Sequence, residues 1–150
     1  MNRDFVEMLS ALFEAGAEFL VVGAHALAVH GTARATGDLD IWVRASPENG
    51  QRVLAALRAF GAPLFDLTLE DLSQPGIVFQ MGLPPARIDL LTGISGVTFD
   101  EAWPTRLTAA VSGMEVPFIG RAELIRNKRA AARPKDLADV AALEAGERPR

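Results

Sequence analysis

Residues 21–43 read VVGAHALAVHGTARATGDLDIWV, and this stretch decides the expected fold. The apolar run Phe19–Val22 predicts a short buried strand. Gly23 then frees the backbone for a tight turn into a helix over residues 24–30, and a polar loop leads to a second strand beginning at Asp38. A helix that follows a strand exposes its first backbone N–H groups, where phosphates often bind, although many such turns contain a glycine and bind nothing.

Two carboxylates, Asp38 and Asp40, open the second strand. Because side chains alternate along a strand, both point to the same face. Like charges this close repel each other unless a cation lies between them, and hard divalent ions such as Mg²⁺ take oxygen ligands of this kind. The pair is therefore a candidate metal site. The alternative is a capping or turn aspartate followed by a solvated strand residue.

A third carboxylate, Asp89, lies inside the apolar strand expected at residues 87–91. An unpaired charge there would be costly, so Asp89 needs a partner. Arg87 on the same face offers a structural ion pair. If this strand instead lies beside the one with Asp38 and Asp40, the three carboxylates converge on a site for a hard cation. The sequence leaves both interpretations open.

The loop before the acidic strand contains Arg34 and Thr36. Arg34 is a candidate phosphate contact, and Thr36 is a candidate hydrogen-bond partner for the backbone or a ligand. A plain surface loop is the alternative. His25 and His30 are five residues apart on the short helix, which is poor spacing for two metal ligands. We expect both to be structural, one buried and hydrogen-bonded and one at the helix end.

Length and composition set the class of protein. The 150 residues suit one domain, residues 1–150, and about half of them are apolar. The absence of cysteine excludes disulfides, thiolate metal sites and a cysteine nucleophile. Acidic residues within the first apolar pattern argue against a secretory leader, and no run reaches membrane-spanning length, so a cytoplasmic protein with no membrane partner is expected.

The C-terminal region carries a basic segment on an acidic chain. The net charge is −4, yet six basic residues and one acid fall between Arg121 and Lys135. This segment indicates either a phosphate-bearing ligand or a solvated helix face.

Periodicity and turn residues predict the remaining elements, while residues 62–75 receive no assignment. The N-terminal helix should end at Gly16, and the next helix should begin at Ser46-Pro47 and end at Gly61. The other expected elements are strands at 77–81 and 87–91, a helix within 98–111 interrupted near Pro104, an extended piece at 116–119, and helices at 121–130 and 135–145.

These features together resemble the polymerase beta-like nucleotidyltransferases, particularly small bacterial members related to the toxins of type IV toxin–antitoxin systems. The matching residues are Gly23 of the turn, the pattern Arg34-x-Thr36-x-Asp38-x-Asp40, Asp89, and a C-terminal pattern from Lys128 through Arg133-Pro-Lys-Asp136-x-x-Asp139. The resemblance spans nearly the whole chain. The family's usual Gly-Gly or Gly-Ser is Gly23-Ala24 here, which removes a serine hydroxyl but keeps the backbone N–H groups.

The resemblance implies an α+β fold, a mixed β-sheet flanked by helices with further helices at the C-terminus. It also implies transfer of a nucleoside monophosphate from a nucleoside triphosphate to a hydroxyl or phosphate of an acceptor. Asp38, Asp40 and Asp89 would hold two Mg²⁺ ions, whereas Gly23, Ala24, Arg34, Thr36 and Lys128 would contact the nucleotide. Transfer RNA, a protein or a small antibiotic-like alcohol all remain open as acceptor, and a cognate antitoxin is a further candidate partner.

Two other functions remain open. A non-catalytic module that binds a nucleotide or a partner would retain the fold and tolerate Ala24, but it would gain little from clustered carboxylates. A nuclease could also use two metal ions, but it would leave the glycine turn and Arg34 without a role.

Overall fold

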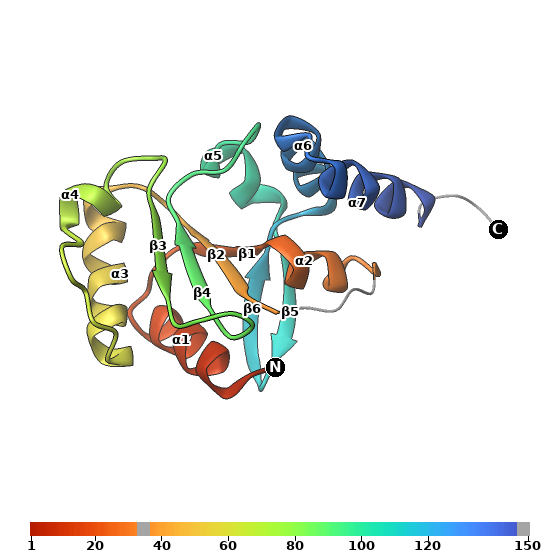
Figure 1. Ribbon diagram of the computed structural model, residues 1–150. Helices are drawn as coiled ribbons and strands as arrows, with labels where there is room; N and C mark the ends of the chain where they lie inside the picture. Colours follow the sequence, from red (N-terminus) through yellow and green to blue (C-terminus); the bar gives the residue numbers. More distant parts are fainter. Residues whose placement is uncertain (33–36, 147–150) are drawn as a thin grey trace.

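The computed structural model describes residues 1–32 and 37–146, which form a six-stranded mixed sheet and seven α-helices (Figure 1). The α+β fold class expected from the sequence is confirmed. The elements are α1 (Arg3–Glu14), β1 (Phe19–Val22), α2 (Gly23–Val29), β2 (Leu39–Val43), α3 (Pro47–Phe60), α4 (Leu69–Leu72), β3 (Val78–Met81), β4 (Ile88–Leu91), α5 (Phe99–Ala102), a 3₁₀ turn (Trp103–Thr105), β5 (Leu107–Val111), β6 (Met114–Phe118), α6 (Arg121–Ala131) and α7 (Pro134–Ala145).

The strand order β3-β4-β2-β1-β6-β5 places the strands of the 21–43 stretch at the centre of the sheet. β1 runs antiparallel to β2 and parallel to β6, and β2 runs parallel to β4. All four residues of β1 are buried, as expected for a central strand covered on both faces. The N-terminal half of the chain therefore supplies the middle of the sheet.

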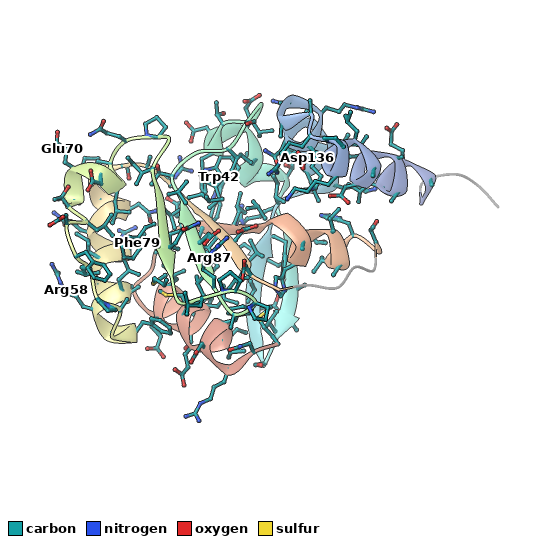
Figure 2. All side chains as sticks on the ribbon, viewed as in Figure 1. Trp42, Arg58, Glu70, Phe79, Arg87 and Asp136 are labelled. Carbon is teal, nitrogen blue, oxygen red and sulfur yellow. The ribbon has the colours of Figure 1, made fainter. Side chains whose placement is uncertain are left out.

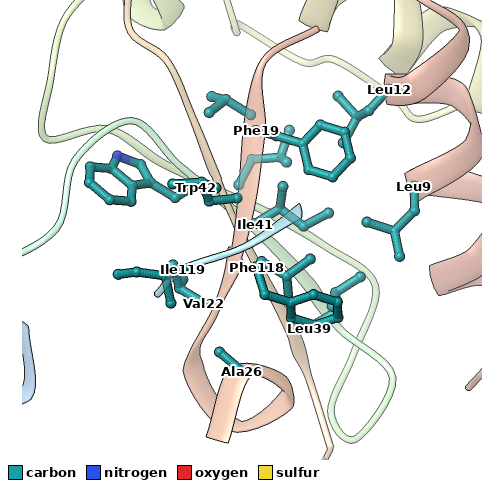
Figure 3. Close-up of a cluster of buried hydrophobic side chains, with 14 of the residues drawn as sticks. Leu9, Leu12, Phe19, Val22, Ala26, Leu39, Ile41, Trp42, Phe118 and Ile119 are labelled. Carbon is teal, nitrogen blue, oxygen red and sulfur yellow. The ribbon is translucent and has the colours of Figure 1, made fainter. Parts of the chain in front are cut away.

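Helices cover the sheet in two groups (Figure 1). α1 and α3 pack together at one side, whereas α6 and α7 pack together near α2. Leu9 and Leu12 of α1 meet Phe19 of β1 in the core, which continues through Ile41 and Phe118 (Figure 3). No helix among the described residues is long and apolar enough to cross a membrane.

The helix boundaries follow local signals. Ser46 caps α3 by accepting a hydrogen bond from the backbone N–H of Asn49 at 3.1 Å, and Pro47 occupies the first turn. Gly61 ends this helix with φ +89°, a left-handed conformation that favours glycine. In the unassigned residues 62–75, Thr68 and Asp71 form a reciprocal capping box that starts α4.

The prediction of a helix within residues 98–111 is correct for the first half of this segment and wrong for the second. α5 ends at Ala102, the 3₁₀ turn contains Pro104, and Leu107–Val111 forms the edge strand β5. β5 pairs with β6 through a hairpin whose turn residues Ser112 and Gly113 have φ of +49° and +81°. Positive φ at both turn positions suits a two-residue hairpin, so the Ser-Gly dipeptide was the missed signal.

Candidate active site

Three aspartates meet on neighbouring strands of the sheet. Asp40 in β2 lies directly opposite Asp89 in β4, because the two parallel strands pair in that register. Asp38 lies one residue before β2, and its Oδ1 accepts a hydrogen bond from the backbone N–H of Arg87 at 3.0 Å. Asp89 is buried, whereas Asp38 and Asp40 are partly exposed. These three residues form the carboxylate cluster.

Asp40 carries the least compensated charge of the carboxylate cluster. Within the described part of the chain it has no ion-pair partner. Its pKa is raised to about 6, first by burial and then by the negative charges of Asp89 and Asp38. A carboxylate in this state gains free energy when a cation approaches.

Arg87 pairs with the two other members of the cluster. Its Nε donates to Oδ1 of Asp89 at 2.8 Å, its Nη2 donates to Oδ2 of Asp89 at 3.2 Å, and the same Nη2 lies 3.4 Å from Asp38. Figure 2 labels Arg87 at the sheet. The structure thus shows both of the arrangements that the sequence left open, since Asp89 forms an ion pair and also lies beside the acidic strand.

Gly23 brings the strand-to-helix turn against Asp40. Val22 is opposite Asp40 in the β1–β2 pairing, and Gly23 follows with φ +69°. A Cβ atom built on Gly23 would lie only 2.3 Å from Oδ2 of Asp40. The residue at this turn must therefore lack a side chain for Asp40 to keep its position.

Lys128 of α6 faces the carboxylate cluster but is already paired. Its side chain is 10% exposed, and its Nζ lies 3.0 Å from Asp139 and 3.5 Å from Asp136, both buried on α7. Arg133 also binds Asp136, at 2.6 Å. The positive charge of Lys128 still lowers the pKa of Asp40, against the larger effects that raise it. Asp136, labelled in Figure 2, and Asp139 therefore fix the position of the lysine.

The other basic residues of the C-terminal segment are largely paired too. Arg126 binds Glu101 and Arg129 binds Glu144, each at 2.6 Å. Most of the segment therefore forms local ion pairs rather than a free basic surface. This favours the interpretation of a solvated helix face over that of a broad phosphate-binding surface.

A cleft with two lobes surrounds Asp40 and Lys128. The first lobe has a volume of about 420 Å³ and is lined by all three aspartates and by Gly23, Ala24 and Lys135, among others. The second has about 440 Å³ and a more neutral wall that includes Ile94, Ser95 and Asn127. A larger groove of about 600 Å³ between α1 and α3 is lined mostly by alanines and other small or apolar side chains, and lies away from the cluster.

The remaining residues singled out in the sequence have mixed outcomes. Arg34 and Thr36 lie outside the described residues. His30 ends α2, and its Nε2 is 2.8 Å from the carbonyl oxygen of Ile119. His25 hydrogen-bonds to the backbone of Gly37, but its Nε2 is buried and has no hydrogen-bond partner among the residues that the structure describes. Burial lowers the pKa of His25. The expected hydrogen-bonded imidazole is thus His25, which is half-buried rather than buried, and the expected helix-end residue is His30.

The loop after β4 braces α6, the helix that carries Lys128. Ser95 accepts a hydrogen bond from the Asn127 side chain at 3.0 Å, and Gly96 accepts one from Arg126 at 3.3 Å. Gly96 has φ +79°, and a Cβ there would lie 2.5 Å from Cβ of Ala130. Sequence reasoning missed this contact, because nothing local marks Gly96 as a packing position.

Replacing Gly96 with alanine is expected to destabilise the protein by about 2–3 kcal/mol, because strain in the left-handed region adds to the collision with α6. Gly61→Ala is the matched control, since Gly61 also has positive φ but has nothing within 4 Å of the added Cβ. It should cost only about 1 kcal/mol. Urea unfolding measures both, and equal losses would contradict the packing argument.

The carboxylate cluster fits a cation by the chemistry of its donor atoms. Its donors are all carboxylate oxygens, and Asp40 lacks an ion-pair partner among the described residues. As the side chains stand in residues 1–32 and 37–146, no three His, Asp or Glu groups are arranged to hold a metal ion. The oxygens of Asp89 and one of Asp38 face the Arg87 guanidinium instead. The cluster thus already holds a cationic group.

No protein-family model and no curated protein matches this sequence. Solved structures do match over almost the whole chain. The solution structure of the antibiotic-resistance factor ANT(2″)-Ia is similar with a TM-score of 0.64 and 14% identity, covering 95% of this chain and 81% of that one. This protein has the nucleotidyltransferase fold. The comparison shows the fold alone, because proteins with so low a sequence identity can share an architecture and differ in activity.

Two further structures share the nucleotidyltransferase fold. The lincosamide antibiotic adenylyltransferase LnuA, bound to lincomycin, matches with a TM-score of 0.58 and 11% identity over 97% of each chain. TM1012 from Thermotoga maritima, described as a candidate nucleotidyltransferase, matches with a TM-score of 0.56 and 12% identity, covering 97% of this chain and 94% of that one. The C-terminal helices expected with this fold correspond to α6 and α7.

Proposed function

We propose that the protein is a nucleotidyltransferase that moves a nucleoside monophosphate from a nucleoside triphosphate to an acceptor hydroxyl or phosphate. The observation that carries the proposal is the meeting of Asp38, Asp40 and Asp89 beside the Gly23 turn. In the reaction, an acceptor oxygen forms a bond to the α-phosphorus while the bond from that phosphorus to the pyrophosphate oxygen breaks.

The site residues divide into two groups. Asp38, Asp40 and Asp89 would hold two Mg²⁺ ions, which when bound offset charge on the triphosphate and lower the pKa of the attacking hydroxyl. The backbone N–H groups of Gly23 and Ala24 lie beside the cluster and suit the phosphate oxygens. Lys128, held by Asp136 and Asp139 in the same cleft, would supply a fixed positive charge to the leaving pyrophosphate.

A small hydroxylated molecule is the acceptor that the electrostatics favour. An RNA acceptor would need a broad basic surface for its phosphates, but the basic residues of α6 are largely paired with acids. ANT(2″)-Ia has been solved with adenylyl-2″-tobramycin and LnuA with lincomycin, so the fold accommodates acceptors of this size. A type IV toxin role and a cognate antitoxin have no separate support.

The test is calorimetric titration of each nucleoside triphosphate into the protein, with and without Mg²⁺. We expect Mg²⁺-dependent binding that Asp38→Asn removes and that Asp66→Asn, at an exposed position outside the cleft, preserves. Transfer of radiolabel from the bound triphosphate to hydroxylated small molecules then measures activity. Binding without transfer to any acceptor would favour the binding module, and label release from RNA or DNA without added triphosphate would favour the nuclease.

A further inference from the structure

Arg87 occupies the centre of the carboxylate cluster in an arrangement that a simple surface ion pair does not require. Its guanidinium binds both oxygens of Asp89, at 2.8 and 3.2 Å, and also reaches Asp38 at 3.4 Å. The side chain is only 28% exposed, and Asp89 is 11% exposed. Screening by solvent is therefore weaker here than at the ion pairs on the surface.

The lone pairs that Arg87 uses are the ones that a metal ion would need. A carboxylate oxygen that accepts a short hydrogen bond from a guanidinium binds a hard cation less tightly, because it has one lone pair fewer to offer and the two positive groups repel each other. A bidentate arginine–carboxylate pair is also among the strongest charge-assisted contacts. Binding of a divalent ion by Asp38 and Asp89 is thus opposed by the guanidinium and is favoured when the guanidinium moves away.

We propose that Arg87 is an internal counter-ion that competes with divalent cations for Asp38 and Asp89 and so sets the metal concentration at which the site fills. The inference rests on the proposed function in that both use the same carboxylates. Displacement is feasible, because Arg87 lies immediately before β4 and lines the first lobe of the cleft, into which its long side chain can turn. Asp40 makes no hydrogen bond or ion pair with Arg87, so an incoming cation would bind first to the Asp40 carboxylate.

If Arg87 competes with the metal ion, its removal should raise the affinity of the site for divalent cations, whereas most substitutions at a binding site lower affinity. Arg87→Met keeps the length of the side chain but removes its charge, so it should tighten binding of Mn²⁺ alone at least fivefold. Arg44→Met is the matched control, because Arg44 is similarly exposed at 24% and binds two acids, Glu18 and Asp100, outside the cluster. It should leave Mn²⁺ affinity within twofold of the original.

The measurement is titration of Mn²⁺ into the full chain without nucleotide, with free Mn²⁺ read by electron paramagnetic resonance. Work at pH 8 keeps Asp40 ionised, since its pKa is about 6. Tightening of less than fivefold in Arg87→Met, or weaker binding, overturns the proposal. Because no nucleotide is present, failure of nucleotidyl transfer would leave this result untouched and would count against the proposed function alone.

A second measurement covers the case in which Arg87→Met does not fold. The Arg87 Nε–H resonance of the original protein, assigned by its absence in Arg87→Lys, is followed by nuclear magnetic resonance during titration with Mg²⁺. We expect this resonance to shift and its proton to exchange faster with water as the guanidinium leaves Asp89. A resonance unchanged at saturating Mg²⁺ overturns the proposal.

Discussion

Replacing Asp40 with asparagine is expected to abolish nucleotidyl transfer while making the protein more stable. Asparagine has nearly the same shape but no charge, so transfer should fall about a thousandfold or more, equivalent to about 4 kcal/mol in the barrier. Stability should rise because the substitution removes a partly buried charge that faces Asp89 and Asp38. A purely structural aspartate would give the opposite change in stability.

The pH dependence of stability follows from the same charge. The pKa of Asp40 is raised from 3.8 to about 6 by burial and by its acidic neighbours. The folded state therefore holds this proton more tightly than the unfolded state, and its charge costs stability. The cost is absent below about pH 4, grows as pH rises, and is complete above about pH 6, where it amounts to about 1–2 kcal/mol after allowance for partial exposure.

Urea unfolding of the original protein and Asp40→Asn at pH 4, 5, 6 and 7, with a chelator present, measures this difference. The two proteins should have similar stability at pH 4 and diverge by pH 7, with the variant more stable. Asp66→Asn is the control, because Asp66 is exposed and away from the cluster. Undiminished transfer in Asp40→Asn would remove the proposed role of the carboxylate.

Replacing Gly23 with alanine should damage both stability and nucleotidyl transfer. The new Cβ would lie 2.3 Å from Oδ2 of Asp40 and 3.1 Å from its Cγ, so the carboxylate or the turn must shift. Strain at φ +69° adds to this collision. We expect a loss of about 3 kcal/mol in stability and of about a hundredfold or more in transfer, because a displacement of about 1 Å at reacting groups has that effect.

Gly113→Ala separates strain from collision. Gly113 has φ +81° in the β5–β6 turn, but an added Cβ there would have nothing within 4 Å. Its replacement should cost about 1 kcal/mol and leave transfer unchanged. Thermal unfolding and radiolabel transfer are measured for Gly23→Ala and Gly113→Ala. Equal losses of stability and of transfer in the two variants would show that the close approach of Gly23 to Asp40 affects neither property.

Local patterns predicted most of the elements near the candidate site. The apolar run of β1, Gly23, and the caps at Ser46 and Gly61 all act over a few residues, and the structure places each of them as expected. The helix prediction for the second half of residues 98–111 was wrong, because Leu107–Val111 contains small residues that suit a helix equally well. Pairing with β6, a tertiary interaction, makes this segment a strand.

The sequence by itself determined which residues carry the charges, and that Asp89 in an apolar strand needs a partner. Only the tertiary structure decided that Asp89 joins a carboxylate cluster as well as pairing with Arg87, because strand order places Asp89 opposite Asp40 and brings Arg87 to Asp38, 49 residues away. It also decided that Lys128 is held by Asp136 and Asp139 across the turn between α6 and α7. Electrostatic energy depends on separation and burial in space, and a linear pattern specifies neither for residues on different elements.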